Sequence, residues 1–466
     1  MKPVFLLLCC MSVRAWAAWN VATEFRVVRL PVSSGLEIVE LFSEERTTRE
    51  ASAMVERMLG DGRAVLVAEL FGTVADRDQL LAKDVTEHRF PTDFESPHPH
   101  LAPTRASGLA IPAAPVAMDV KNIGTTLQSS PTVLADGAVI QASIATQRVS
   151  YRGNFRYEYG IRADGIKYVV EQPKFVTAKT NTTIVARSGI PTLVGCYLEH
   201  EKPEQLELHT VTLTASGTAE PKAEAEPVGA IRMSRIALLR YRLPVAEGIR
   251  ARIAIERGDR AADEILRKLA AEGKATLAAC VSLPTYPWQQ SLHENVLEVR
   301  YPTEFDAGGG GPPTLQVDKR GAAFWALPPR LNRENRRHFS DPPRTVVTPD
   351  YIPLPPPTVF EVMNVGSVFE IEIDPYYASE SAALLNVNDK QIENNGFIRR
   401  IDVADHQGER LFNYQPAFTE RRTMTNRALP VGKWVLETFH RRTAPNDDVE
   451  ITIARLKTNR FTLKTP

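Results

Sequence analysis

Cysteine is scarce in this sequence, which has four among 466 residues. Cys9 and Cys10 lie at the amino terminus, and Cys196 and Cys280 are the other two. The latter pair stands in two separate apolar segments of the kind that form strands. Two buried free thiols fit these positions better than a disulfide, although an oxidising compartment would permit one.

An excess of charge of one sign is also missing. The 56 basic residues balance the 56 acidic ones, and the sequence pI is near 7.1. A general nucleic-acid surface would need a basic excess, so we expect no nucleic-acid partner. Beyond the first residues, no run is apolar enough to cross a membrane as a helix. With 466 residues, the chain is long enough for two or three domains, each with its own core.

The motifs of common enzyme classes are absent. No Gly-x-Ser-x-Gly nucleophile motif occurs, and His200 lacks the second histidine of the zinc-protease motif. His98 and His100 lie in a proline-rich stretch without the cysteines or carboxylates that would complete a metal site. The glycine run 308–311 is not followed by the Lys-Ser/Thr of a phosphate-binding loop. We therefore expect no catalytic residues, no cofactor and no metal, and a protein that is not an enzyme.

The first 17 residues differ from the rest of the chain. Lys2 gives a positive start, residues 4–11 are apolar, and residues 15–17 (Ala-Trp-Ala) fit a cleavage site. This pattern predicts a secretory signal peptide over residues 1–17. The apolar run is too short for a membrane-spanning helix. The mature chain is therefore expected to be exported.

One hexapeptide occurs twice, as Arg-Phe-Pro-Thr-Asp-Phe at 89–94 and Arg-Tyr-Pro-Thr-Glu-Phe at 300–305. Other blocks recur around it in the same order. They are 29–32 with 242–245, 119–124 with 361–366, and 172–175 with 415–418. An ordered series of this kind predicts a tandem duplication. We expect a first repeat over 18–215, a linker over 216–229 and a second repeat over 230–466, with a long Pro/Gly-rich loop over 306–357.

Apolar periodicity predicts a mainly β (α+β) fold with one principal amphipathic helix in each repeat. In the first repeat the helix covers 51–59, with Thr47 and Glu50 as a capping box and a stop at 60–62. The equivalent helix of the second repeat begins near Asp259 and stops at Gly273. Segment 36–42 is predicted to be a strand. Segments 64–74 and 85–90 are predicted to be the two strands of a hairpin. Further strands are expected at 25–30, 122–132, 139–149, 175–185, 192–197, 206–213, 275–283, 296–301, 368–373, 384–387, 418–427, 434–439 and 449–456.

Two basic groups of residues stand out. Arg330, Arg333, Arg336 and Arg337 lie in the long loop, close to Phe324 and Trp325. Aromatic and arginine side chains are common anchors at interfaces, and loops often carry binding function. These six residues are therefore the candidate interaction surface, with a solvated loop as the alternative. The second group consists of Arg421, Arg422, Arg441 and Arg442.

Taken together, the blocks resemble the homology domain of bacterial secretins, the outer-membrane channel subunits of type II and type III secretion systems and of type IV pili. The divergent secretin-like proteins of planctomycete and verrucomicrobial type are the most similar. The matching positions in the first repeat are Gly62, 90–94, 122–124, Pro131, 136–137, 155–160, 188–189 and 193–195. Those in the second are Gly273, 301–305, 364–366, Pro375, Gly396 and Gly432. Within them we single out the structural motif residues Pro91, Thr92, Gly124, Pro302, Thr303 and Gly366.

The chain also departs from the secretin pattern. Both repeats lack the Pro-Leu-Leu-Gly-like segment before the closing strand, and secretins carry one homology domain per chain. The resemblance implies a structural or assembly component of secretin-type secretion or pilus machinery, in the periplasm or associated with the outer membrane. Its partners would be proteins of that machinery, copies of itself or the outer membrane. The alternative is an exported tandem β-rich module that binds extracellular ligands and has no part in secretion.

Overall fold

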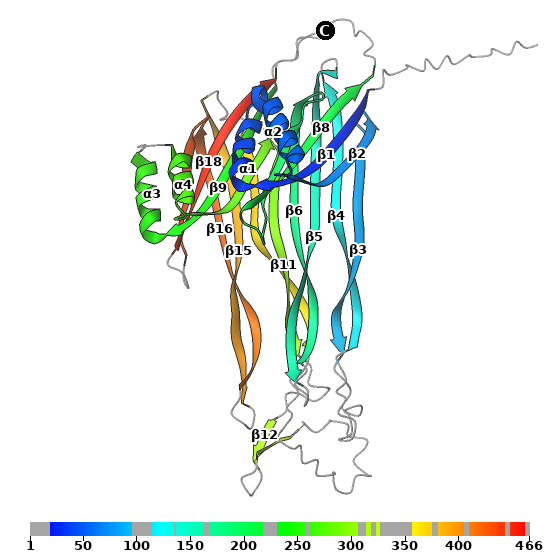
Figure 1. The fold of residues 1–466 in the computed structure, drawn as a ribbon, viewed down its shortest axis with the longest axis vertical. Coiled ribbons are helices and arrows are strands. Elements are labelled where there is room, and N and C mark those ends of the chain that lie inside the picture. Colours follow the sequence, from blue (N-terminus) through cyan, green and yellow to red (C-terminus); the bar gives the residue numbers. More distant parts are fainter. Residues whose placement is uncertain are drawn as a thin grey trace, which may run out of the picture.

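The computed structural model describes residues 19–95, 114–134, 137–161, 167–217, 231–257, 261–305, 314–317, 323–326, 357–374, 381–404, 410–442 and 448–461. The fold is mainly β, which confirms the predicted fold class. Long strands run along the molecule, and helices gather near one end (Figure 1).

The same order of elements occurs twice. The first copy consists of β1 (Asn20–Pro31), α1 (Val32–Phe42), η1 (Glu45–Thr47), α2 (Thr48–Gly60), β2 (Val65–Ala75), β3 (Leu80–Glu95), β4 (Ala114–Leu134), β5 (Val139–Ile161), β6 (Lys167–Arg187), β7 (Thr192–Leu198) and β8 (Gln205–Ser216). The second consists of β9 (Ile231–Pro244), α3 (Val245–Arg257), α4 (Ala262–Ala271), β10 (Thr276–Thr285), β11 (Ser291–Phe305), β14 (Pro357–Asp374), β15 (Ala382–Ala404), β16 (Arg410–Pro430), β17 (Trp434–Arg441) and β18 (Asp448–Phe461). A short pair, β12 (Thr314–Val317) and β13 (Ala323–Ala326), lies within the predicted long loop.

The elements stack in three layers. Two small sheets, ordered β2-β1-β8-β7 and β10-β9-β18-β17, lie between the helices and one half of the long strands. Strand β1 explains this middle position, because both of its faces are apolar and each must be covered. Val28 and Leu30 pack toward the helices, whereas Phe25 and Val27 pack toward the long strands. The core beneath the helices is continuous across both repeats.

The long strands form one sheet. Its extended hydrogen-bonded pairs run β3-β4-β5-β6 in the first repeat and β11-β14-β15-β16 in the second, and β6 pairs with β11. One further residue pair, Asp93 with Val359, joins β3 to β14. Phe94 and Phe360 contact each other beside it, with ring centroids 5.8 Å apart.

Glycine marks the points at which the long sheet divides into separate two-stranded arms. Strand β4 pairs with both neighbours down to Gly124 and only with β3 beyond it. Strand β14 pairs with β15 only from Gly366 onward. Both glycines have positive φ, 133° and 144°, and a Cβ would lie 2.1 and 2.2 Å from the carbonyl oxygens of Asp84 and Asn295. Only glycine fits this backbone and this close approach, which explains the repeated Asn-x-Gly motif.

Each repeat has two helices where the sequence predicted one principal helix. The predicted helices correspond to α2 and α4, but segment 36–42, predicted as a strand, belongs to α1. Its Leu36, Val39 and Phe42 are buried at intervals of three residues, which is helical spacing, although its β-branched residues favour a strand. The predicted capping box does not form either, because the Thr47 hydroxyl donates to the backbone oxygen of Leu41 at 2.6 Å.

Both α2 and α4 end in the same way. Gly62 and Gly273 take positive φ, and the following residue donates from its N–H to a carbonyl five positions back. This is the Schellman ending that the glycine stop signals predicted. The predicted hairpin of 64–74 with 85–90 is wrong, since β2 pairs with β1 and β3 pairs with β4. The polar turn carries the chain from a small sheet to the long sheet.

Candidate functional site

The two repeats meet along β6 and β11. Seven residue pairs, from Phe175 with Glu298 to Asn181 with Leu292, form an antiparallel ladder. Beside it, the Sγ atoms of Cys196 on β7 and Cys280 on β10 lie 3.2 Å apart, and both thiols are buried and free. The hydrogen bond with Cys280, together with burial, holds the pKa of Cys196 well above its usual value.

His293 is a further buried titratable group of this junction. Its Nε2 donates to the backbone oxygen of Cys196 at 2.9 Å, and its ring stacks on Tyr197 with centroids 4.4 Å apart. Burial lowers the pKa of His293 to about 4. The neutral imidazole is therefore the form that the junction holds at neutral pH.

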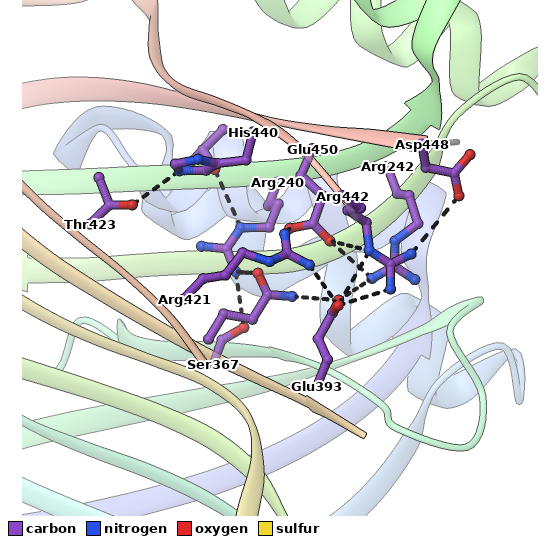
Figure 2. Close-up of polar contacts among 12 residues, drawn as sticks. Arg240, Arg242, Ser367, Glu393, Arg421, Thr423, His440, Arg442, Asp448 and Glu450 are labelled. Atoms are coloured by element: carbon purple, nitrogen blue, oxygen red, sulfur yellow. Dashed lines mark hydrogen bonds and ion pairs between the residues drawn. The ribbon is translucent and has the colours of Figure 1, made fainter. Parts of the chain in front are cut away.

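A partly buried charge cluster lies in the second repeat, between its small sheet and the long sheet, with Glu450 as its buried member. Arg242, Arg421 and Arg442 converge on Glu393 and Glu450 (Figure 2). The nitrogen–oxygen distances from Arg242 are 2.8 Å to Glu393 and 2.9 Å to Glu450. Burial acts to raise the pKa of Glu450, but the arginines outweigh it and the pKa lies below its ordinary value. The Glu450 carboxylate therefore stays ionised.

Arg240 extends this cluster toward the long sheet. Its guanidinium pairs with Asp389 and donates to Gln391 at 2.9 Å and to Ser367 at 3.3 Å. It also stacks on the ring of Phe369, 5.1 Å from the centroid. Arg240 and Asp389 are both buried, so each charge depends on the other for compensation.

The first repeat has a cluster at the equivalent place. Arg29, which matches Arg242 in the repeated Arg-Leu-Pro-Val block, lies 3.1 Å from Glu199 and 3.3 Å from Glu207. Arg148 contacts Glu207 at 2.9 Å, and Arg152 pairs with Glu199. Burial acts to raise the pKa of Glu207, but the hydrogen bond from His209 and the nearby arginines lower it to about 2.

In both clusters the carboxylate oxygens are already engaged by guanidinium groups, so their arrangement suits holding β-strands together more than proton transfer. The sequence singled out Arg29 and Arg242 only through their place in the repeated block at 29–32 and 242–245. The other members were not predicted as a cluster, because strand pairing brings them together from distant parts of the chain. The second basic group divides: Arg421 and Arg442 join the cluster, whereas Arg422 donates to Asn388 at 2.9 Å on the exposed face of β16.

A groove of 710 Å³ opens between the repeats on the helical side. The first repeat contributes the region around η1, and the second contributes Val431, Gly432 and Lys457. Its walls carry four cationic side chains and two carboxylates: Arg46, Arg49, Arg187, Lys457, Glu44 and Glu45. Glu44 and Glu45 are engaged by Lys457 and Arg187.

The sequence-predicted interaction residues are only partly described. Phe324 and Trp325 belong to β13, which pairs with β12. Arg330, Arg333, Arg336 and Arg337 lie outside the described residues, as do His98, His100 and the glycine run 308–311. His200 is partly buried, and this burial lowers its pKa.

The structural motif residues occupy matching positions. The strand register shifts next to Pro91 on β3 and next to Pro302 on β11, which leaves Thr92 and Thr303 as the unmatched residues. The side-chain amide of Gln172 donates to the carbonyl oxygen of Pro91 at 2.9 Å. The motif therefore sets a bulge in the first strand of each long hairpin.

Among the described residues, no group of three or more His, Cys, Asp or Glu side chains is arranged to hold a metal ion. No helix in the described part of the chain is long and apolar enough to cross a membrane. In comparisons with protein-family models, curated proteins and solved structures, no match to this chain was found.

Proposed function

We propose that this chain is a non-enzymatic structural or assembly component related to secretin-type secretion or pilus machinery, exported to the periplasm or the outer membrane. The observation that carries the proposal is the long sheet. Two hairpin sets are already joined edge to edge through β6 and β11, so sheet extension is the way in which this fold connects its units. The ordered sequence motifs supply the secretin resemblance.

The two ends of the long sheet support this role. In the described part of the chain, β16 pairs only with β15, and β3 pairs with β4 apart from the single contact at Asp93. Such strands present unsatisfied backbone groups that accept a further strand. The charge clusters tie the small sheets to the long sheet in both repeats, so ion pairs connect the two layers next to the edges.

Covalent capture in the native cell envelope tests the proposal. The tagged full-length chain would be cross-linked in cells, purified and its partners identified. We expect recovery with the envelope fraction in complexes that contain secretion or pilus proteins. Recovery as a free monomer, with neither envelope proteins nor lipid attached, would contradict the proposal.

The inter-repeat groove favours a second candidate, an exported module that binds ligands. Its excess of cationic side chains suits an anionic ligand. Calorimetric titration with a glutamate tetrapeptide tests this candidate. The matched variant is Arg49→Glu, which reverses a charge in the groove wall. Saturable binding that this variant abolishes would favour the ligand-binding module over the assembly component.

A further inference from the structure

The junction between the two repeats, where β6 pairs with β11, shows how one repeat binds to another. It joins β6, the last long strand of the first repeat, to β11, the first long strand of the second. The strands that are equivalent to these two lie at the opposite ends of the long sheet. Strand β16 is equivalent to β6, and β3 is equivalent to β11. A second copy of the chain could therefore continue the sheet by repeating the same junction.

Apolar side chains are exposed on the first repeat at positions whose equivalents in the second repeat are buried. Phe71 on β2 is 69% exposed, whereas Ser282, its equivalent on β10, is fully buried beside the first repeat. Met118 on β4 is 59% exposed, whereas its equivalent, Phe360, is 8% exposed because Phe94 and Tyr157 of the first repeat pack against it. The free face of the first repeat thus has the apolar character of a surface that a preceding repeat covers.

The opposite end of the molecule has a matching set. Met424 on β16 is 74% exposed. On α3, Ile249 and Ile253 are also exposed. Ile253 is equivalent to Glu40 of α1, whose carboxylate pairs with Arg455 and Lys457 of the second repeat. Helix α3 therefore presents an apolar face at the place where α1 holds the neighbouring repeat.

We propose that a second copy of this chain is the partner of these edges, with β16 of one copy pairing with β3 of the next in the register of β6 with β11. This inference rests on the proposed function, and it names the partner of the sheet edges.

The register predicts the facing residues. The internal pair Leu292 with Asn181 translates into Leu81 opposite Met424, so two exposed apolar side chains meet. The pair Asn295 with Ala178 translates into Asp84 opposite Arg421, which have opposite charges, although Arg421 also contacts Glu393 and Glu450. The pair Glu294 with Lys179 translates into Lys83 opposite Arg422, which have like charges. The apolar contact, and not charge, is therefore what the register contributes to the pairing.

The pairing has a direction. The two surfaces differ, so the contact is heterologous, and copies add head to tail into a closed ring or an open filament. A two-fold dimer, in which one surface meets itself, is a different arrangement. Single-cysteine variants distinguish the two.

The experiment uses full-length Leu81→Cys and Met424→Cys variants, each with Cys9 and Cys10 changed to serine. The native thiols Cys196 and Cys280 are buried and stay in place. Each variant alone and an equal mixture are oxidised with copper phenanthroline and resolved on a non-reducing gel. We expect at least tenfold more disulfide-linked dimer in the mixture than in either variant alone.

A matched control replaces Met424→Cys with Glu420→Cys, four residues away on the same face of β16. Four residues of strand span about 13 Å, beyond the reach of a disulfide to Leu81→Cys. This mixture should give at least tenfold less product. Dimers that form equally well from one variant alone would overturn the head-to-tail pairing.

Light scattering on the unmodified protein separates the two ideas. Large assemblies that form without the Leu81–Met424 cross-link would overturn the inference and leave the proposed function standing. The same holds if the chain stays monomeric in solution but is cross-linked to envelope proteins in cells. A monomer without any envelope partner would overturn both. In addition, Met424→Asp should reduce the assembled fraction at least fivefold, whereas Asn426→Asp, just beyond the expected ladder, should leave it unchanged.

Discussion

Replacement of Glu207 by glutamine would test the buried charge cluster of the first repeat. The side chain is buried, and it accepts from Arg148, Arg29 and His209. Glutamine keeps the shape but removes the negative charge. Arg148, whose side chain is only 14% exposed, then loses its carboxylate partner. Removing one member of a buried ion pair typically costs about 3–5 kcal/mol of unfolding free energy.

The pKa of Glu207 gives an independent magnitude. Its value of about 2 in the folded chain lies below its ordinary value of 4.5, so the ionised form stabilises the fold. At neutral pH this contribution is about 3 kcal/mol, and it is lost as the pH falls from about 4.5 toward 2. Between pH 5 and pH 3, the stability difference between the wild type and Glu207→Gln should therefore shrink by about 2 kcal/mol.

Urea unfolding followed by circular dichroism at pH 7, 5 and 3 provides the measurement. Glu201→Gln is the matched control, because Glu201 is 53% exposed and lies 3.9 Å from Arg152, and it should change stability by no more than about 0.5 kcal/mol. If the wild type and Glu207→Gln lose the same stability between pH 5 and pH 3, the cluster is not held by an ionised Glu207.

Three further predictions follow from the junction and the arms. The pKa of His293 in the folded chain is about 4, below its ordinary 6.5, so the neutral form stabilises the fold. Lowering the pH from 7.5 to 5 should therefore reduce the free energy of unfolding, measured with urea, by about 2 kcal/mol. The His293→Gln variant should not show this loss. Gly124→Ala should cost at least about 3 kcal/mol in thermal unfolding, because its Cβ would strike a neighbouring strand at positive φ; Gly60→Ala, with open space around it, should gain about 0.5–1 kcal/mol. In a variant with Cys9 and Cys10 changed to serine, Cys196 and Cys280 should not react with a thiol-specific chromogenic disulfide for an hour in the folded protein and should react fully in denaturant. Fast labelling of the folded variant would contradict their burial.

Sequence patterns predicted most of the strands, because alternation and repeated blocks are local signals, but β9 and α3 were not among the predicted elements. The helix α1 was missed because Ile38 and Val39 favour strands, and only the helical spacing of Leu36, Val39 and Phe42 separates the two outcomes. Its burial against the small sheet decides in favour of the helix.

The site was harder to predict than the fold. The pairing of β6 with β11 depends on which sheet edges come together in the fold. The sequence pattern of neither strand specifies the strand with which it pairs. Glu207 and Arg148 lie 59 residues apart, so no spacing rule connects them. The repeated Arg29 and Arg242 were visible only as part of a matching block, without any indication that each would face a buried carboxylate.

The continuous core beneath the helices has a consequence for folding. Side chains of both repeats, such as Leu198 and Leu208 of the first and Tyr241 and Leu266 of the second, belong to one apolar cluster. Neither repeat can open without exposing part of the other, so the two should melt as one cooperative unit in a single calorimetric transition. A chain cut back to one repeat would expose to water the apolar side chains of this cluster that the other repeat covers, so neither repeat is expected to be as stable alone as it is in the whole chain.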